Sequence, residues 1–225
     1  MTSSKQADAP DFPVSDHNRL RRAAERGHYD RDTVYAVLDA GLLCHIGYEI
    51  DGQPYVTPTA YWRDGDRVYW HGSTGSRMLM HQRAGVPVCL TVSHMDGLVM
   101  ARSAFHHSVN YRSVMAFGTT EPVLDDDEKA RQLERLIERL APGRWAELRP
   151  MTAKEFKATL VMSLKLDDVV AKVRSGPPVD DEADYALPVW AGVLPVRTVV
   201  AAPEDDPRLN PGIRAPANLS ALTLG

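Results

Sequence analysis

The fold of this chain is decided by residues 42–70, which read LLCHIGYEIDGQPYVTPTAYWRDGDRVYW. Apolar residues run through 42–50 and recur through 55–62, and each run ends at an Asx-Gly pair, Asp51-Gly52 and Asp64-Gly65. Such pairs favour tight turns between antiparallel strands, because Gly adopts positive φ without strain. Two of them so close together predict an antiparallel meander and not the helix-linked strands of a parallel sheet.

The rest of the chain adds helices and further strands to this meander. The clearest helix is expected over 125–140, where an acidic first turn precedes apolar residues spaced with a helical period. Other helices are expected over 75–84 and over 152–159, together with a short helix through Asp39 that either Asp30 or Asp32 can cap. Strands are expected over 86–92, 98–101, 111–123 and 187–196, with one long strand inside 160–173. These elements predict a mainly β domain, an antiparallel barrel with helices packed at its side.

Composition places domain boundaries near the two ends of the chain. Residues 1–17 are polar and contain Pro, and are expected to form a flexible arm, with regular structure beginning near Tyr29. The segment after residue 197 is rich in Pro and Ala and is expected to be a loose tail. We therefore expect an arm over 1–17, one domain over 18–197 and a tail over 198–225.

Charge and cysteine content exclude several classes of protein. The net charge of −4 argues against a dedicated nucleic-acid binder, because such proteins gain affinity by neutralising phosphates. No apolar stretch approaches the ~18–20 residues needed to span a membrane, and the first residues lack the apolar region of a secretory signal. The two cysteines, Cys44 and Cys89, lie in apolar runs and are expected to be free thiols. We expect a cytoplasmic protein.

Residues 71–77, His-Gly-Ser-Thr-Gly-Ser-Arg, have the composition of an anion-holding turn. Small residues let the backbone approach a phosphate, the hydroxyls donate hydrogen bonds, and the next helix offers unpaired N–H groups. Arg77 adds a planar guanidinium that suits phosphate oxygens. The turn matches neither a P-loop nor the GxGxxG of a dinucleotide fold. On spacing alone, an ordinary strand-to-helix turn with a surface arginine fits equally well.

Several motifs in order resemble the FMN-binding split-barrel proteins related to pyridoxamine 5′-phosphate oxidase. They are the hairpin at 52–55, the turn at 71–77 and Asn110-Tyr111-Arg112-Ser113-Val114 leading to Gly118. The segments 172–178 and 187–192 resemble the branch described as flavin-nucleotide-binding proteins. This resemblance implies an antiparallel split β-barrel of Greek-key type and a homodimer with FMN at the subunit interface.

The resemblance also implies which residues meet the flavin. Ser76 and Arg77 would hold the phosphate, residues 55–59 would run along the isoalloxazine and ribityl chain, and Trp190 would stack near the ring. His71 is the candidate for touching a substrate. The full expected set is Tyr55, Thr57, Pro58, Thr59, His71, Gly72, Ser73, Ser76, Arg77, Arg112, Ser113 and Trp190.

The sequence departs from the oxidases of this family at two places. Met78 stands where they have a lysine directly after the phosphate arginine. The C-terminal Arg-x-His that holds their substrate is missing, because Arg197 is followed by Thr198-Val199. Oxidation of pyridoxamine phosphate is therefore not the expected reaction.

Three functions stay open at this point. The first is an FMN-dependent oxidoreductase with an unidentified small-molecule substrate. The second is a non-catalytic protein that stores FMN or another planar cofactor such as haem, with His71 as the haem ligand. The third is a dimeric structural module with a decayed site. No metal site is expected, because the histidines, including His94, His106 and His107, lack the spacing of metal ligands.

Overall fold

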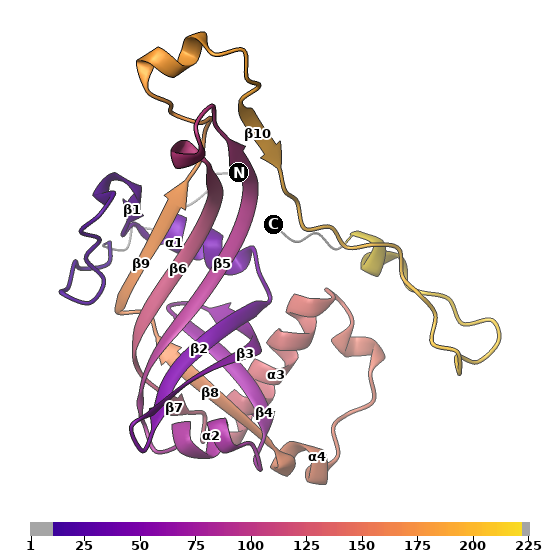
Figure 1. Ribbon diagram of the computed structural model, residues 1–225. Helices are drawn as coiled ribbons and strands as arrows, with labels where there is room; N and C mark the ends of the chain where they lie inside the picture. Colours follow the sequence, from indigo (N-terminus) through magenta and orange to yellow (C-terminus); the bar gives the residue numbers. More distant parts are fainter. Residues whose placement is uncertain (1–10, 222–225) are drawn as a thin grey trace, which may run out of the picture.

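The structure is a computed structural model that describes residues 11–221, and an antiparallel sheet wraps around its centre (Figure 1). The strands lie in the order β1-β9-β6-β5-β2-β3-β4-β8-β7, and β10 pairs with β5 outside this path. Their bounds are β1 Gly27–His28, β2 Leu43–Ile50, β3 Gln53–Asp64, β4 Arg67–Ser73, β5 Pro87–Met100, β6 Ser108–Thr119, β7 Glu121–Pro122, β8 Thr159–Lys165, β9 Asp168–Arg174 and β10 Gly192–Pro195. The predicted antiparallel split barrel with flanking helices is confirmed.

The predicted meander is formed by β2, β3 and β4. Ile50 pairs with Gln53 across the first turn, where Asp51 and Gly52 adopt φ of 51° and 78°. Asp64 pairs with Arg67 across the second turn, where Gly65 adopts φ of 59°. These left-handed conformations explain why each turn carries a Gly.

Several predicted strands differ in extent from the observed ones. The expected strands over 86–92 and 98–101 are one strand, β5, with a bulge between Met95 and Gly97. The expected long strand inside 160–173 is two strands, because the chain turns at Leu166, whose N–H bonds to Asp66 O at 2.8 Å. Strand β8 then pairs with β4 and β9 with β6. The last strand, β10, does not include Trp190.

Four α-helices flank the sheet, at α1 Arg31–Asp39, α2 Arg77–Gln82, α3 Asp126–Leu140 and α4 Ala153–Ala158. Side chains of Asp30, Asp125 and Thr152 cap α1, α3 and α4, and Thr152 forms a capping box with Glu155. Helix α2 is shorter than the predicted 75–84, because the turn before it continues to Ser76. Short 3₁₀ helices are η1 Ala24–Arg26, η2 Ala104–His106, η3 Trp145–Glu147, η4 Glu182–Ala186 and η5 Ala217–Ala221.

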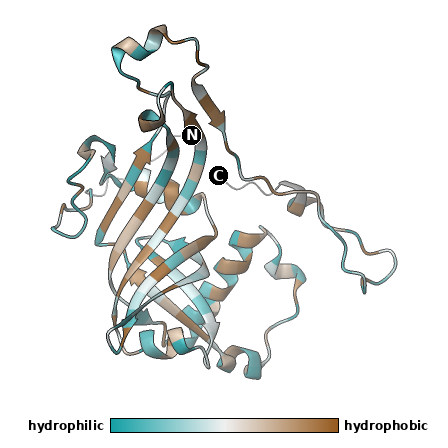
Figure 2. Ribbon diagram, viewed as in Figure 1, coloured by the Kyte–Doolittle hydropathy of each residue, from teal (hydrophilic) through white to brown (hydrophobic). Residues whose placement is uncertain are grey.

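Two clusters of apolar side chains hold the sheet and the helices together. The larger fills the barrel, with Trp70, Leu79 and Leu90 fully buried. The smaller joins the other face of β3 and β4 to α3, through Trp62 and Tyr69 packed on Leu133 and Leu136. The strands accordingly carry apolar residues along much of their length (Figure 2). Within residues 11–221, no helix is long and apolar enough to cross a membrane.

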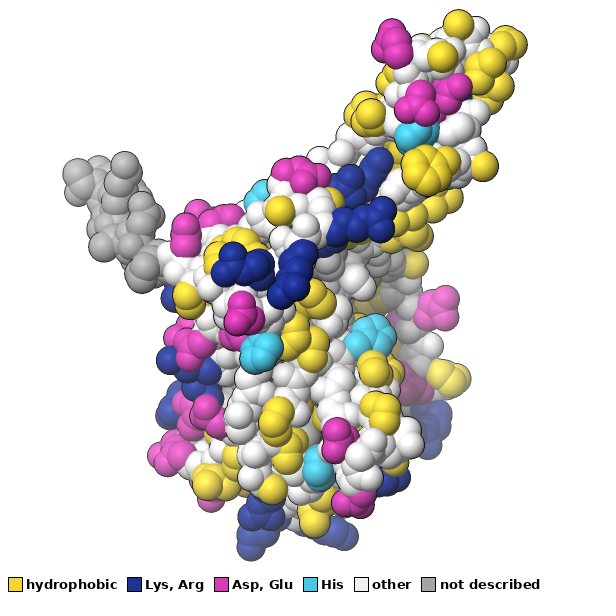
Figure 3. All heavy atoms as spheres, turned by 60° about the vertical axis from the view of Figure 1, so that its left-hand side comes forward, with side chains coloured by type: hydrophobic (Ala, Val, Ile, Leu, Met, Phe, Trp, Pro, Cys, Tyr) yellow, Lys and Arg dark blue, Asp and Glu magenta, His cyan; other side chains and the backbone are white. Residues whose placement is uncertain are grey.

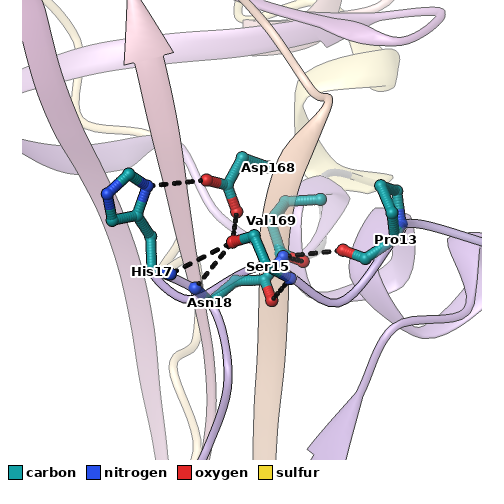
Figure 4. Close-up of polar contacts among 6 residues, drawn as sticks. All are labelled: Pro13, Ser15, His17, Asn18, Asp168 and Val169. Atoms are coloured by element: carbon teal, nitrogen blue, oxygen red, sulfur yellow. Dashed lines mark hydrogen bonds and ion pairs between the residues drawn. The ribbon is translucent and has the colours of Figure 1, made fainter.

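Residues 11–17 were expected in a flexible arm but lie against β9 (Figure 4). Phe12 is buried in the barrel cluster, which explains why the segment is held in place. Asp168 accepts a 2.7 Å hydrogen bond from Ser15 Oγ and lies 3.1 Å from His17 Nδ1. Residues 1–10 of the expected arm lie outside the described residues. On this side of the molecule, acidic and basic side chains are interspersed along the left edge, and several Lys and Arg side chains gather across the upper middle (Figure 3).

Candidate functional site

The predicted phosphate turn connects β4 to α2 at the end of the barrel. Most of its polar groups are already paired inside the chain. Thr74 N bonds to Ala158 O at 2.9 Å, Ser76 N to Ser73 O at 2.9 Å, and Gly75 N to Ser73 Oγ at 3.1 Å. Gly75 and Ser76, the first two residues of the expected helix, therefore have no free amide. Within residues 11–221, the amides of Arg77 and Met78 have no acceptor.

The serine hydroxyls of the turn also have structural partners. Ser76 Oγ caps α2 by accepting from Leu79 N, and Ser73 Oγ accepts from Gly75 N. Gly72 has a packing role, because a Cβ there would lie 2.9 Å from Leu79 Cδ1. Both oxygens act only as acceptors in these bonds, so the two hydroxyls can still donate to an anion, as can the guanidinium of Arg77.

Arg77 lies over the ring of Tyr55, across the end of the hairpin. Its guanidinium carbon is 4.8 Å from the ring centroid, and Nη2 donates a 2.8 Å hydrogen bond to the tyrosine hydroxyl. The Tyr55 ring stacks on Tyr48 at 5.6 Å, and Tyr48 Oη lies 3.0 Å from Thr57 Oγ1. The structure thus brings together Arg77, Tyr55 and Thr57, which the sequence predicted separately.

The other predicted residues of β3 divide between the two faces of the strand. Thr59 pairs with the buried Cys44, so it shares a face with Tyr55 and Thr57. Pro58 pairs with His45 on the opposite, exposed face. Because side chains alternate along a strand, residues 55–59 cannot all face one ligand in a single chain.

His71 is half-buried on β4, on the same strand face as Tyr69. Its ring centroid lies 6.1 Å from that of Trp62. Burial lowers the pKa of His71, which favours the neutral imidazole. Its Nδ1 is buried and has no hydrogen-bond partner within residues 11–221.

Arg112 and Ser113 lie away from the phosphate turn. Arg112 forms a bidentate ion pair with Asp96, at 2.8 and 3.0 Å, and this hydrogen bonding raises the pKa of Arg112. Ser113 Oγ donates to Lys172 O at 3.3 Å on the opposite face of β6. Trp190 is 65% exposed in the loop before β10, and β10 and α2 lie at opposite ends of the molecule (Figure 1). Within a single chain, Trp190 therefore lies far from Arg77.

Arg112 lines a cavity of about 610 Å³ that the sequence did not predict. The cavity opens where one edge of β5 has no neighbouring strand, between its pairing with β2 at Thr91 and with β10 at Gly97, while its other edge stays paired with β6. His45, His94 and Arg197 also line it. His94 Nε2 lies 2.9 Å from Val37 O. In the sequence, the Asp96-Gly97 pair inside an apolar run was the available sign of this break in the strand pairing, because a Gly within a strand is typical of a bulge.

Comparison with known proteins places this geometry in a family. The family model described as pyridoxamine 5′-phosphate oxidase matches residues 30–173, which include the meander, the turn and β9 up to Val173. The chain belongs to the pyridoxamine 5′-phosphate oxidase family. This membership confirms the resemblance seen in the sequence. The matched residues include the turn before α2 and the part of the cavity lining on β2, β5 and β6, whereas Arg197 lies beyond them.

Solved structures resemble this family member over most of its length. The flavocytochrome Anf3 from Azotobacter vinelandii is 47% identical with a TM-score of 0.91, covering 96% of this chain and 100% of its own. An FAD and haem binding protein from Mycobacterium smegmatis is 38% identical with a TM-score of 0.84, covering 88% and 97%. A structure described as a 5-nitroimidazole antibiotic resistance protein from Bacteroides thetaiotaomicron shares the fold, at 20% identity and a TM-score of 0.53 over 65% and 86%. A search of curated proteins finds no match.

Proposed function

We propose that this chain binds a flavin nucleotide and acts as a flavin-dependent oxidoreductase. The observation that carries the proposal is the 47% identity to a flavocytochrome over 96% of the chain. A bound flavin supplies the electron transfer, and the protein supplies binding and electrostatics. The missing Arg-x-His leaves the substrate open, and it argues against pyridoxamine phosphate.

The residues at the turn fit a flavin phosphate. Arg77 has no carboxylate partner within residues 11–221, and one of its N–H groups donates to Tyr55. Its remaining N–H groups and the unpaired amides of Arg77 and Met78 give the donors that a phosphate needs. Thr57 and Thr59 follow Tyr55 along the same strand face, where they can orient the rest of the nucleotide. FMN is the flavin that the family resemblance implies, whereas the similar mycobacterial protein is named for FAD.

A second function, haem binding, is favoured by the names of both similar proteins. We propose that His71 is the haem ligand. A metal ligand must be a neutral imidazole, and burial favours that form of His71. The orphaned Nδ1 supports a role beyond packing, because buried polar atoms are seldom left unpaired. Haem would supply one-electron chemistry, while His71 would fix its position.

We also propose a homodimer, with a second copy covering the exposed face of the sheet. Leu98 on β5 pairs with Val109 on β6 and Leu194 on β10, so the three side chains share one face. All three are exposed, as is Val56 on the outer face of β3. Adjacent exposed apolar side chains such as Leu98, Val109 and Leu194 mark interaction surfaces.

The absorption spectrum of the purified full chain tests the flavin and haem proposals together. We expect flavin bands, a Soret band, and bleaching of the flavin when NAD(P)H or another hydride donor is added. A protein that retains no flavin after incubation with FMN and FAD would overturn the flavin proposal. Flavin that stays bound but accepts electrons from no donor would favour storage over catalysis.

A further inference from the structure

The cavity beside β5 is lined by two guanidinium groups and one carboxylate. Asp96 accepts hydrogen bonds from Nε and Nη2 of Arg112, at 3.0 and 2.8 Å, so this arginine matches its charge. The side chain of Arg197 has neither a carboxylate partner nor a hydrogen-bond acceptor within residues 11–221. The other titratable side chains of the lining are His45 and His94. With both histidines neutral, the lining therefore carries one positive charge in excess.

Backbone contacts hold the walls of this cavity in place. Val196 N donates a 3.0 Å hydrogen bond to Asp96 O, so the segment after β10 stays against β5, and Arg197 follows directly. In the wall formed by the turn between α1 and β2, a Cβ on Gly41 would lie 2.7 Å from Cε1 of His94. The missing side chain of Gly41 thus lets this turn pack against the imidazole. The guanidinium of Arg197 takes no part in these contacts and remains for a ligand.

Charge and apolar surface together specify the class of ligand. The planar N–H groups of an arginine fit carboxylate oxygens. Nη1 of Arg112 adds two donors, because neither of its N–H groups has an acceptor within residues 11–221. One excess positive charge matches a carboxylate, whereas a phosphomonoester carries about −1.5 to −2 charges at neutral pH. Much of the remaining lining is apolar, from Ala40, Leu42, Leu43, Met95, Val196 and Val199.

We propose that the cavity beside β5 binds an organic carboxylate with an apolar body, whose carboxylate is held by Arg197 and Arg112. The volume of about 610 Å³ is that of a small-molecule site. Because every lining residue belongs to one chain, neither flavin binding nor the homodimer is needed for this site. The cavity is thus a ligand site in addition to the turn before α2.

Calorimetric titration of the full chain with benzoate, benzamide and acetate in turn tests the proposal. Benzamide keeps the ring without the charge, and acetate keeps the charge with only a methyl group. We expect benzoate to bind at least about 10-fold more tightly than benzamide, near the lower limit for hydrogen bonds to a charged group. It should also bind more tightly than acetate, because its ring buries apolar surface, and more tightly than inorganic phosphate. The heat of binding needs neither flavin nor turnover.

Two variants should change the affinity for benzoate in opposite directions. Arg197→Gln removes the unpaired charge and should lower this affinity about 10-fold, while the affinity for benzamide stays the same. Asp96→Asn removes the competing carboxylate and should raise the affinity for benzoate, because Arg112 then has no charged partner. Arg208→Gln, at an exposed position of the same C-terminal segment outside the cavity lining, is the matched control and should change neither affinity.

Several outcomes would overturn the proposal. They are equal affinities for benzoate and benzamide, a preference for benzoate that survives Arg197→Gln, and a chain that binds neither probe. Acetate or inorganic phosphate binding as tightly as benzoate would overturn the assigned class of ligand. If Arg197→Gln also loses benzamide binding and its circular dichroism changes, the direction of the Asp96→Asn effect decides. A chain that binds no flavin but shows the expected preference for benzoate would overturn only the proposed flavin function.

Discussion

Gln82, the last residue of α2, accepts a 2.9 Å hydrogen bond from Nε1 of Trp70, and both side chains are fully buried. The backbone carbonyl of Gln82 also accepts a 2.6 Å hydrogen bond from Thr120 Oγ1. Because α2 begins at Arg77, these contacts fix the helix that carries the candidate site to the barrel core. The position of Arg77 thus depends on a polar pair inside the apolar cluster.

Replacing Gln82 with Leu should destabilise the protein by about 1–3 kcal/mol, because the indole N–H of Trp70 loses its buried acceptor. Urea unfolding measures this cost. In a Trp70→Phe background, which has no N–H to satisfy, the same Gln82→Leu change should cost less. Equal costs in the two backgrounds would show that the hydrogen bond contributes nothing beyond packing.

Replacing Arg77 with Ala should weaken flavin binding by the ~1.5–3 kcal/mol typical of a hydrogen bond to a charged group. Titrations with FMN and with FAD, followed by flavin fluorescence, give the affinity. Arg83→Ala removes an exposed charge next to the same helix and should have little effect. Unchanged affinity in Arg77→Ala would place the flavin phosphate elsewhere.

Replacing His71 with Ala should abolish the Soret band if haem is held by the imidazole, and added imidazole should restore part of it. His45 lines the 610 Å³ cavity on the exposed side of β2 and is the matched control. His45→Ala should keep the spectrum of the unaltered protein. A Soret band that is lost in His45→Ala and kept in His71→Ala would indicate that the haem binds in the cavity.

The burial of His71 should make stability fall in acid. Its folded pKa lies below the usual 6.5, so the unfolded chain binds the proton more readily. Stability from this group is therefore full above 6.5 and is lost as the pH falls through that value. Urea unfolding between about pH 8 and about pH 5 should show a shallower decline in His71→Phe than in the unaltered protein. Equal declines of the unfolding free energy with pH in the two proteins would contradict the lowered pKa of His71.

A charge on the exposed sheet face should disrupt the proposed homodimer. Val56→Glu places a carboxylate on the outer face of β3, where the side chain is 68% exposed in a single chain. Sedimentation should show a dimer for the unaltered chain and a monomer for Val56→Glu. Leu124→Glu, at a 73% exposed position between β7 and α3, should remain dimeric. A monomer at every concentration before any substitution would overturn the proposal.

The sequence by itself determined the features that depend on neighbouring residues. The Asx-Gly turns fix the meander because only a few residues fit their left-handed conformations. The helix starts at Asp30, Asp125 and Thr152 follow from caps that bond three residues ahead. The turn at 71–77 was located from its composition and its place between a strand and a helix.

Only the tertiary structure decided what that turn can do. Three of its amides bond to Ser73 or to Ala158, which lies far away in sequence, and Ser76 Oγ accepts from Leu79 N in α2. Arg77, the first residue of α2, lies over the ring of Tyr55 on β3, whereas the predicted Arg112 lines the cavity beside β5. Local sequence sets backbone conformation, whereas the partners of a polar side chain depend on how distant segments pack. The sequence therefore located the turn, and the packing of distant segments decided which of its amides are paired and placed Arg77 against Tyr55.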